Sequence, residues 1–260
     1  MEAEANQKGI VIKLIFVLLL FMIKMAKKFK EEWKTYQNVF DNFTHRNLFK
    51  LAAKGFFEEL SSTITLGKEA NIFSAITKDE THVIVKIYRL QNCDFNKMYD
   101  YLQIDPRFQN LTKQRRKVIF GWTQREYQNL VKAREAGVEV PTPLYFMNNI
   151  LVMQLIGKKD QVAPMLKDAL PDDCQDFFER TLRAYKKLYQ QGLVHGDLSE
   201  FNILNHQNRP VLIDFSQATQ LRNPNAESYL KRDIRNIQRF FSKHCFECDE
   251  EDIYKRITGK

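Results

Sequence analysis

The sequence predicts an α+β fold in which a small sheet with one prominent helix precedes a mostly helical half. Residues 62–90 alternate β-branched and polar side chains around a glycine and a polar turn, which is typical of hairpins. Residues 113–136 instead place apolar side chains three and four positions apart, which indicates a long helix. Helical patterns at residues 172–191 and 226–243 account for most of the second half, with the latter as the final helix.

Other elements are expected around this framework. Residues 31–60 predict a helical prelude, because their apolar side chains recur at helical spacing. These side chains are Val39, Phe43, Leu48, Leu51 and Phe56. The helix at 113–136 should end at Gly137, since glycine favours helix C-termini and two prolines soon follow. The apolar run at 150–157 predicts a buried strand.

Composition and charge limit the class of protein. With 260 residues, of which 44% are hydrophobic and 12% aromatic, the chain can bury a sizeable core and is globular rather than disordered. The net charge of +8 and the pI near 9.2 favour polyanionic partners such as RNA, nucleotides or an anionic membrane surface. The four cysteines lack the spacing of a secreted scaffold, so the sequence predicts a reduced, cytoplasmic setting and no structural disulfide.

An apolar segment near the start of the chain has three interpretations. Residues 10–23 are apolar apart from Lys13, but a membrane-spanning helix needs roughly 20 apolar residues. If the segment inserts, the basic residues that follow it would keep the rest of the chain on the cytoplasmic side. A signal peptide fits less well, because the basic residues come after the apolar run. In the third interpretation residues 1–24 are a mis-assigned start or a dispensable extension, and translation begins at Met25.

Charged and amide side chains interrupt the apolar runs of residues 192–217. Asp197 lies on a loop five residues before Asn202, and Asp214 ends an apolar strand twelve residues after that asparagine. Mg²⁺ prefers carboxylate and amide oxygens together with phosphate. Phosphoryl transfer needs a carboxylate that orients or deprotonates the nucleophile, an asparagine and an aspartate on metal, and a lysine on the triphosphate. The spacing is therefore typical of a Mg²⁺-nucleotide site.

Lys86 and Glu126 are candidates for the remaining roles. Lys86 interrupts an apolar strand, where a cation needs a partner, and Glu126 in the middle of a helix can supply the opposite charge. Each residue alone also fits a structural role: Lys86 on an edge strand, Glu126 on a solvated helix face, and His195 in ordering the loop. The ordered set of lysine, glutamate, Asp-x4-Asn and aspartate on strand, helix, loop and strand is more specific than any one member.

This ordered set resembles the protein-kinase-like fold, and more narrowly the RIO family of atypical kinases in its type-1, archaeal-like short form. The similar segments are LGKEANIFSA, VKIYR, DFNKMYDYLQIDPRF, WTQREYQNL, EAGVEVPTPL, VMQLIG, VHGDLSEFNIL and LIDFSQA, within residues 39–243. The resemblance implies a two-lobed α+β kinase-like fold with an N-terminal helical extension. It divides the chain into the apolar segment 1–24, N-terminal helices at 25–60, a kinase N-lobe at 61–153 and a C-lobe at 154–260.

The resemblance also implies where ATP binds. Gly67 and Lys68 would belong to a reduced phosphate loop, because an ordinary kinase carries Gly-x-Gly-x-x-Gly there and this chain has one glycine. Lys86 would contact the α- and β-phosphates, with Glu126 as its ion-pair partner. The implied hinge, a gatekeeper followed by two residues with backbone groups for adenine, consists of Met153, Gln154 and Ile156.

Three residues of the loop region would carry the chemistry by resemblance. Asp197 would be the catalytic carboxylate, and Asn202 and Asp214 would hold Mg²⁺ or Mn²⁺. In the family the last aspartate is also implicated as an acceptor that forms an aspartyl-phosphate intermediate, so Asp214 counts among the catalytic residues too.

Function and partners follow from the same resemblance. The chain is expected to be an ATP-dependent serine/threonine protein kinase or ATPase in small ribosomal subunit maturation, with the precursor rRNA and ribosomal proteins as partners. Basic runs at 113–117 and 231–239 would support phosphate contacts with RNA, although each also fits a solvated helix face. Membrane contact is expected only if residues 10–23 are translated and inserted. Two alternatives stay open: a small-molecule kinase of the aminoglycoside or sugar type, and an ATP-binding assembly switch with little catalysis.

Two further segments carry weaker signals. Residues 91–110 correspond to a mobile insertion in the family, and we expect them to fold over the nucleotide or the ribosome. Cys245 and Cys248 with His244 nearby lack the four ligands of a structural zinc site, so a metal role there is disfavoured.

Overall fold

The computed structural model describes residues 40–91, 93–159 and 161–260, which fall into two units that divide after Ala53. In the first unit, helix α2 (Asn42–Ala53) begins where the Asp41 carboxylate accepts hydrogen bonds from two backbone N–H groups, at 2.9 and 2.8 Å. The apolar segment 10–23 and its membrane interpretation lie outside the described residues. Within the described ranges, no helix has the length and apolarity that a membrane span requires.

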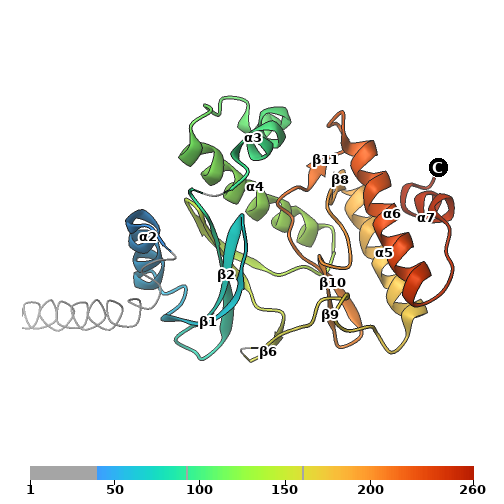
Figure 1. The fold of residues 1–260 in the computed structure, drawn as a ribbon, viewed down its shortest axis with the longest axis horizontal. Coiled ribbons are helices and arrows are strands. Elements are labelled where there is room, and N and C mark those ends of the chain that lie inside the picture. Colours follow the sequence, from blue (N-terminus) through green and yellow to red (C-terminus); the bar gives the residue numbers. More distant parts are fainter. Residues whose placement is uncertain (1–39, 92, 160) are drawn as a thin grey trace, which may run out of the picture. The chain divides into compact units, whose positions relative to one another are not determined.

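A five-stranded antiparallel sheet opens the second unit (Figure 1). Its strands lie in the order β1-β2-β3-β5-β4, with bounds β1 Glu59–Leu66, β2 Ala70–Ile76, β3 His82–Tyr88, β4 Pro143–Met147 and β5 Ile150–Gln154. The central strand β3 is buried from Val83 to Tyr88. A charged side chain on this strand therefore needs a partner inside the protein.

The sheet starts earlier than the helical pattern of residues 31–60 suggests. Glu59 and Leu60 belong to β1, because Glu58 N–H already donates to the Ile76 carbonyl at 2.7 Å and begins the ladder with β2. Phe56 stacks on Tyr145 of β4, with ring centroids 4.4 Å apart. Long-range pairing with the sheet thus overrides the local helical spacing.

Helices between β3 and β4 support one side of this sheet. Helix α4 (Arg115–Glu135) contacts β4 and β5, and Gly137 follows it with a φ of +69°, a left-handed conformation that glycine adopts without strain. Before α4, residues 93–110 contain helix α3 (Phe95–Ile104) and the short 3-10 helix η2 (Pro106–Phe108). α3 packs against α4.

The second half of this unit is mostly helical. Helices α5 (Cys174–Gln190) and α6 (Ala226–His244) lie side by side (Figure 1), with the Phe178 and Phe241 rings 5.0 Å apart between them. Three short two-stranded antiparallel sheets complete it: β6 (Gly157–Lys158) with β7 (Gln161–Val162), β8 (Leu193–Val194) with β11 (Thr219–Gln220), and β9 (Ile203–His206) with β10 (Arg209–Leu212). A further helix, α7 (Glu250–Thr258), follows α6, so the expectation that residues 226–243 form the final helix is wrong. Asp249 caps α7 through hydrogen bonds from two backbone N–H groups.

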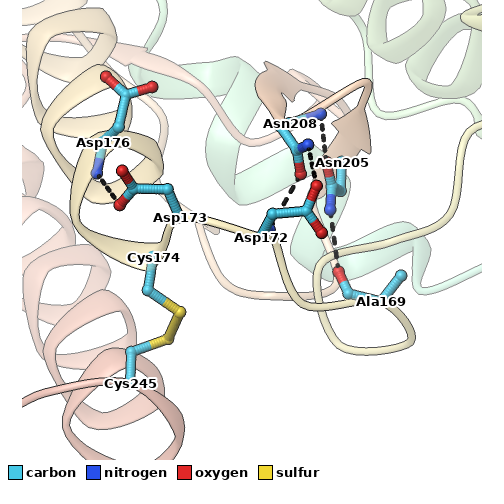
Figure 2. The surroundings of a disulfide bond; sticks show 8 residues. All are labelled: Ala169, Asp172, Asp173, Cys174, Asp176, Asn205, Asn208 and Cys245. Carbon is cyan, nitrogen blue, oxygen red and sulfur yellow. Dashed lines mark hydrogen bonds between the residues drawn. A yellow bond between two sulfur atoms is a disulfide. The ribbon is translucent and has the colours of Figure 1, made fainter.

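A disulfide joins the start of α5 to the end of α6, which corrects the prediction of no structural disulfide. Cys174 and Cys245 are 71 residues apart in sequence, but their Cα atoms lie 6.0 Å apart, within the normal range for a disulfide. Figure 2 shows that the segment before α5 is also tied to the β9–β10 turn, where Asn208 bonds Asp172. Sequence spacing could not reveal this pair, because only the packing of α5 against α6 brings the two cysteines together.

Replacing Cys174 with serine should lower the free energy of unfolding by about 2–4 kcal/mol, because the cross-link restricts the unfolded chain. Denaturant unfolding with and without a reducing agent measures this effect. Cys248→Ser is the matched control, since Cys248 is not disulfide-bonded. If the reducing agent lowers the free energy of unfolding of the wild-type protein no more than that of Cys174→Ser, the disulfide does not stabilise the fold.

Candidate active site

Lys86 lies between two carboxylates. Its Nζ is 2.8 Å from Glu126 Oε1 and 3.1 Å from Asp214 Oδ1. β3 contributes the lysine and α4 contributes the glutamate, while Asp214 follows β10. Burial alone would lower the pKa of Lys86, but the negative charges of Asp214 and Glu126 outweigh it and raise this pKa above its ordinary value. Lys86 is therefore a permanent cation in the interior.

Asp214 has an unusual backbone and an accessible carboxylate. Its φ is +59°, a left-handed conformation that is uncommon outside glycine, and its side chain is 39% exposed. Burial would raise the pKa of Asp214, but the charge of Lys86 and hydrogen bonds from Ser216 and Lys86 lower it to about 2. The carboxylate is thus ionised at neutral pH. Only one of its oxygens, Oδ1, accepts hydrogen bonds from the residues that the structure describes.

Asp197 and Asn202 share a loop between β8 and β9. Asn202 Nδ2 donates to the backbone carbonyl of Asp197 at 2.8 Å, and Gln217 Nε2 donates to Asp197 Oδ2 at 3.0 Å. Burial, and then the negative charge of Asp214, raise the pKa of Asp197. A carboxylate with a raised pKa is better matched to accepting a proton near neutral pH than an ordinary aspartate.

Asp233 of α6 binds the backbone of this loop. The sequence analysis did not identify this residue. Its carboxylate accepts from Gly196 N–H at 2.7 Å, Leu198 N–H at 2.9 Å and the Tyr185 hydroxyl at 2.5 Å. These bonds fix the backbone on both sides of Asp197. A signal was present in the sequence, because Asp233 falls on the buried face of α6 at helical spacing from Leu230.

The residues expected around the nucleotide lie in two places: Gly67 and Lys68 in the first turn of the sheet, and the hinge residues at the end of β5 and just after it. Gly67 and Lys68 form the turn between β1 and β2, where Gly67 N–H donates to Ala70 O at 3.0 Å and the Lys68 side chain is exposed. A Cβ at Gly67 would lie 2.8 Å from Ala70 O, so the turn requires glycine. No hydrogen bond or ion pair between described residues connects these two residues to Lys86.

Met153 and Gln154 end β5, and Ile156 follows it. Met153 packs against the core that α5 and α6 share, and Gln154 N–H donates to Thr142 O at 2.8 Å. The Ile156 carbonyl accepts from Ala163 N–H at 2.8 Å. Among the described residues, nothing accepts a hydrogen bond from Ile156 N–H, which makes this donor a candidate for contact with a ligand.

His195 is a fully buried neighbour of the site. Its Nε2 lies 3.0 Å from the Ile213 carbonyl, so this nitrogen carries the proton in the neutral ring, which packs 4.7 Å from the Phe215 ring. Burial lowers the pKa of His195 to about 4. These contacts agree with a role in ordering the loop.

The buried His195 ring should make stability depend on pH. Between pH 6.5 and about 4 the unfolded histidine binds a proton that the folded one does not, so stability is lost as the pH falls through this window. The loss should approach about 3 kcal/mol, and His195→Gln, which keeps a donor but does not titrate, should remove it. Denaturant unfolding from pH 4 to 7 measures the difference, with His206→Gln as control. Parallel pH profiles for the wild-type protein and His195→Gln would contradict this.

Comparisons with known proteins agree on one family. Residues 71–253 match the model described as the RIO domain. Proteins named RIO-type serine/threonine-protein kinase Rio1 are similar: that of Haloferax volcanii is 39% identical over 236 residues, covering 91% of this chain and 81% of the relative. That of Methanocaldococcus jannaschii is 40% identical over 240 residues, covering 92% and 82%.

Solved structures show the same fold. The crystal structure of the Rio2 kinase–ADP/Mg²⁺–phosphoaspartate complex from Chaetomium thermophilum has a TM-score of 0.64 and 23% identity, and covers 84% of this chain and 67% of that one. The likeness confirms the predicted fold class, a two-lobed α+β kinase-like fold. At this identity it bears on the fold alone.

Proposed function

Because this chain belongs to the RIO domain family and is a RIO-type protein kinase, we propose that it transfers the γ-phosphoryl group of ATP at the site around Lys86, Asp197 and Asp214. The observation that carries this proposal is the buried cation Lys86, bonded at once to Glu126 and to Asp214. A lysine that is paired with one buried carboxylate and also contacts a second, partly exposed carboxylate is suited to binding phosphate oxygens.

The side-chain oxygens of Asp197, Asn202 and Asp214 fit a divalent cation. Within the described residues, one side-chain oxygen on each of three residues accepts no hydrogen bond: Asp197 Oδ1, Asn202 Oδ1 and Asp214 Oδ2. Such carboxylate and amide oxygens suit Mg²⁺, and they suit Mn²⁺ as well. Asn202 and Asp214 would hold the ion, which neutralises charge on the phosphates when bound.

The chain's own residues divide the remaining work. Asp197 orients the acceptor group and takes its proton, since burial and Asp214 raise its pKa. Ile156 N–H and the Gln154 backbone are the groups for adenine, with Met153 beside them as gatekeeper. Gly67 and Lys68 cover the phosphates from the β1–β2 turn.

The finer assignments are also part of the proposal. The chain belongs to the type-1 subfamily, acts in the cytoplasm on the small ribosomal subunit precursor, and passes through an aspartyl phosphate. In its formation an Asp214 oxygen bonds the γ-phosphorus of ATP as ADP leaves; water or a hydroxyl group, which loses its proton to Asp197, then takes the phosphoryl group and restores the Asp214 carboxylate. The net charge of +8 supports contact with rRNA. The partly exposed side chain of Asp214, whose Oδ2 accepts no hydrogen bond from the described residues, supports its role as acceptor. The Rio2 complex contains a phosphoaspartate, which is an observation on that protein.

A turnover assay with γ-labelled ATP and Mg²⁺, with and without small ribosomal subunits, tests the proposal. Label on the protein and free phosphate are followed together in the full chain and in Asp214→Ala. Hydroxylamine separates an acyl phosphate, which it cleaves, from phosphoserine or phosphothreonine, which it does not. Protein label or subunit-stimulated phosphate release that Asp214→Ala abolishes is the expected result.

Other outcomes of this assay point to the two alternatives. Intact ATP binding without turnover would indicate an assembly switch with little catalysis. Turnover that requires added sugars or aminoglycosides would indicate a small-molecule kinase.

A further inference from the structure

The geometry points to Gln217 as the residue that positions the catalytic carboxylate of Asp197, and to Tyr101 of α3 as the residue that holds Gln217. Neither residue carries a role in the proposed function, and the inference rests on Asp197 being the catalytic carboxylate. Two hydrogen bonds form the connection: Tyr101 Oη to Gln217 Oε1 at 2.9 Å, and Gln217 Nε2 to Asp197 Oδ2 at 3.0 Å. We call this chain of contacts the Tyr101–Gln217–Asp197 relay.

The chemistry of the groups determines the orientation of the Gln217 amide. An ionised carboxylate only accepts hydrogen bonds, so the NH₂ group must face Asp197. The amide oxygen then faces Tyr101, whose hydroxyl donates to it. A flipped amide would set two acceptors against each other at Asp197. Asp197 therefore sets the orientation of the amide, and Tyr101 holds the amide oxygen in place.

Gln217 provides the better of the two side-chain contacts on Asp197. Asn202 directs its shorter bond, 2.8 Å, to the Asp197 backbone carbonyl and lies 3.4 Å from Oδ2. Asp233 holds the backbone N–H groups on either side and does not touch the carboxylate. The rotation of the carboxylate about its last bond is thus set mainly by Gln217.

Hydrogen bonds hold the backbone on both sides of Gln217. Buried Arg125 donates to the carbonyls on both sides, Ser216 O at 3.1 Å and Ala218 O at 3.0 Å. A Cβ placed on Gly196 would lie 3.0 Å from Gln217 O, which shows how closely the two loops approach. These contacts hold the backbone from which the Gln217 side chain extends.

Tyr101 connects this site to a helix that precedes α4. Its ring stacks with Tyr229 of α6 at 5.6 Å, and the Arg125 guanidinium lies 5.2 Å from its centroid. The hydroxyl reaches Gln217 only while α3 keeps this position. A displacement of α3 would release the Gln217 amide and lower the rate of phosphoryl transfer without touching the residues proposed for ATP.

Isosteric variants test the relay in the full chain. Gln217→Met keeps the length of the side chain and should lower kcat about tenfold with little change in the KM for ATP, because it removes a hydrogen bond to a charged group. Tyr101→Phe should lower kcat about threefold through the loss of a neutral hydrogen bond. Tyr99→Phe on the same helix is the matched control, since the Tyr99 ring contacts Lys113 and not the relay.

The double variant separates a relay from two independent effects. If Tyr101 acts through Gln217, adding Tyr101→Phe to Gln217→Met should not lower kcat further. Thermal unfolding of each variant shows whether it is folded. If Gln217→Met does not fold, the relay is tested with Tyr101→Phe alone. Multiplying effects in the double variant, or an unchanged kcat in either single variant, would overturn the relay. If Asp197→Asn retains turnover, another group accepts the proton, and the relay fails together with the proposed role of Asp197. If only the relay variants leave kcat unchanged, the role of Asp197 stands and the relay alone fails.

Discussion

Asp197→Asn should lower kcat by about 10²–10⁴-fold, the range typical for loss of a general base, with ATP affinity nearly unchanged. The amide keeps the size of the side chain but cannot take a proton. Among the described residues, Asp197 makes no hydrogen bond or ion pair with the lysine or with the hinge, so the groups proposed for ATP remain in place. Single-turnover kinetics with labelled ATP and a separate nucleotide-binding titration measure the two quantities.

Asp168→Asn is the matched control for this change. Asp168 is exposed and pairs with Lys167, so its replacement should leave kcat at the wild-type value. Wild-type turnover in Asp197→Asn would show that another group accepts the proton. A loss of ATP affinity equal to the loss of kcat would instead place Asp197 in nucleotide binding.

Arg125→Met should lower the free energy of unfolding by about 3–5 kcal/mol, because it leaves buried polar groups without their partner. Arg125 is fully buried and bonds Asp105 at 3.3 Å as well as the carbonyls of Ser216 and Ala218. Methionine fills part of the volume but donates nothing, so Ser216 O would be buried without a hydrogen bond. Denaturant unfolding measures the change.

Arg134→Met on the same helix serves as control, since Arg134 is exposed and makes one long bond of 3.4 Å to Val140 O. A loss below about 1 kcal/mol in Arg125→Met would mean that water or movement of the loop compensates for the missing donors. The same variant should also reduce turnover, because the loop it releases carries Gln217.

Local sequence patterns were sufficient for much of the fold. The helix that became α4 was expected at 113–136 and spans Arg115–Glu135, and the one expected at 172–191 spans Cys174–Gln190. Both have long apolar periodicities, and short-range spacing determines which face of a helix is buried. The weaker pattern at 31–60 was less informative, because pairing with β2 draws its last residues into β1.

Part of the site was open to the same reasoning. A lone lysine in a buried strand requires a counter-charge, which directed attention to Glu126, and the structure places the two 2.8 Å apart. The motif of Asp197, Asn202 and Asp214 could also be recognised, because the three residues lie in order within a short stretch of sequence. The catalytic and nucleotide-binding roles of these residues stay predictions that the variants above address.

By itself, the sequence determined the family, the fold class and the residues that carry the motif, because these depend on local spacing and on the order of residue types. Only the tertiary structure decided which distant groups meet. The Cys174–Cys245 bond, the Asp233 support and the link from Tyr101 to Gln217 each join segments at least 35 residues apart. Their partners are chosen by how helices pack, and the spacing of residues along one segment contains no record of that packing.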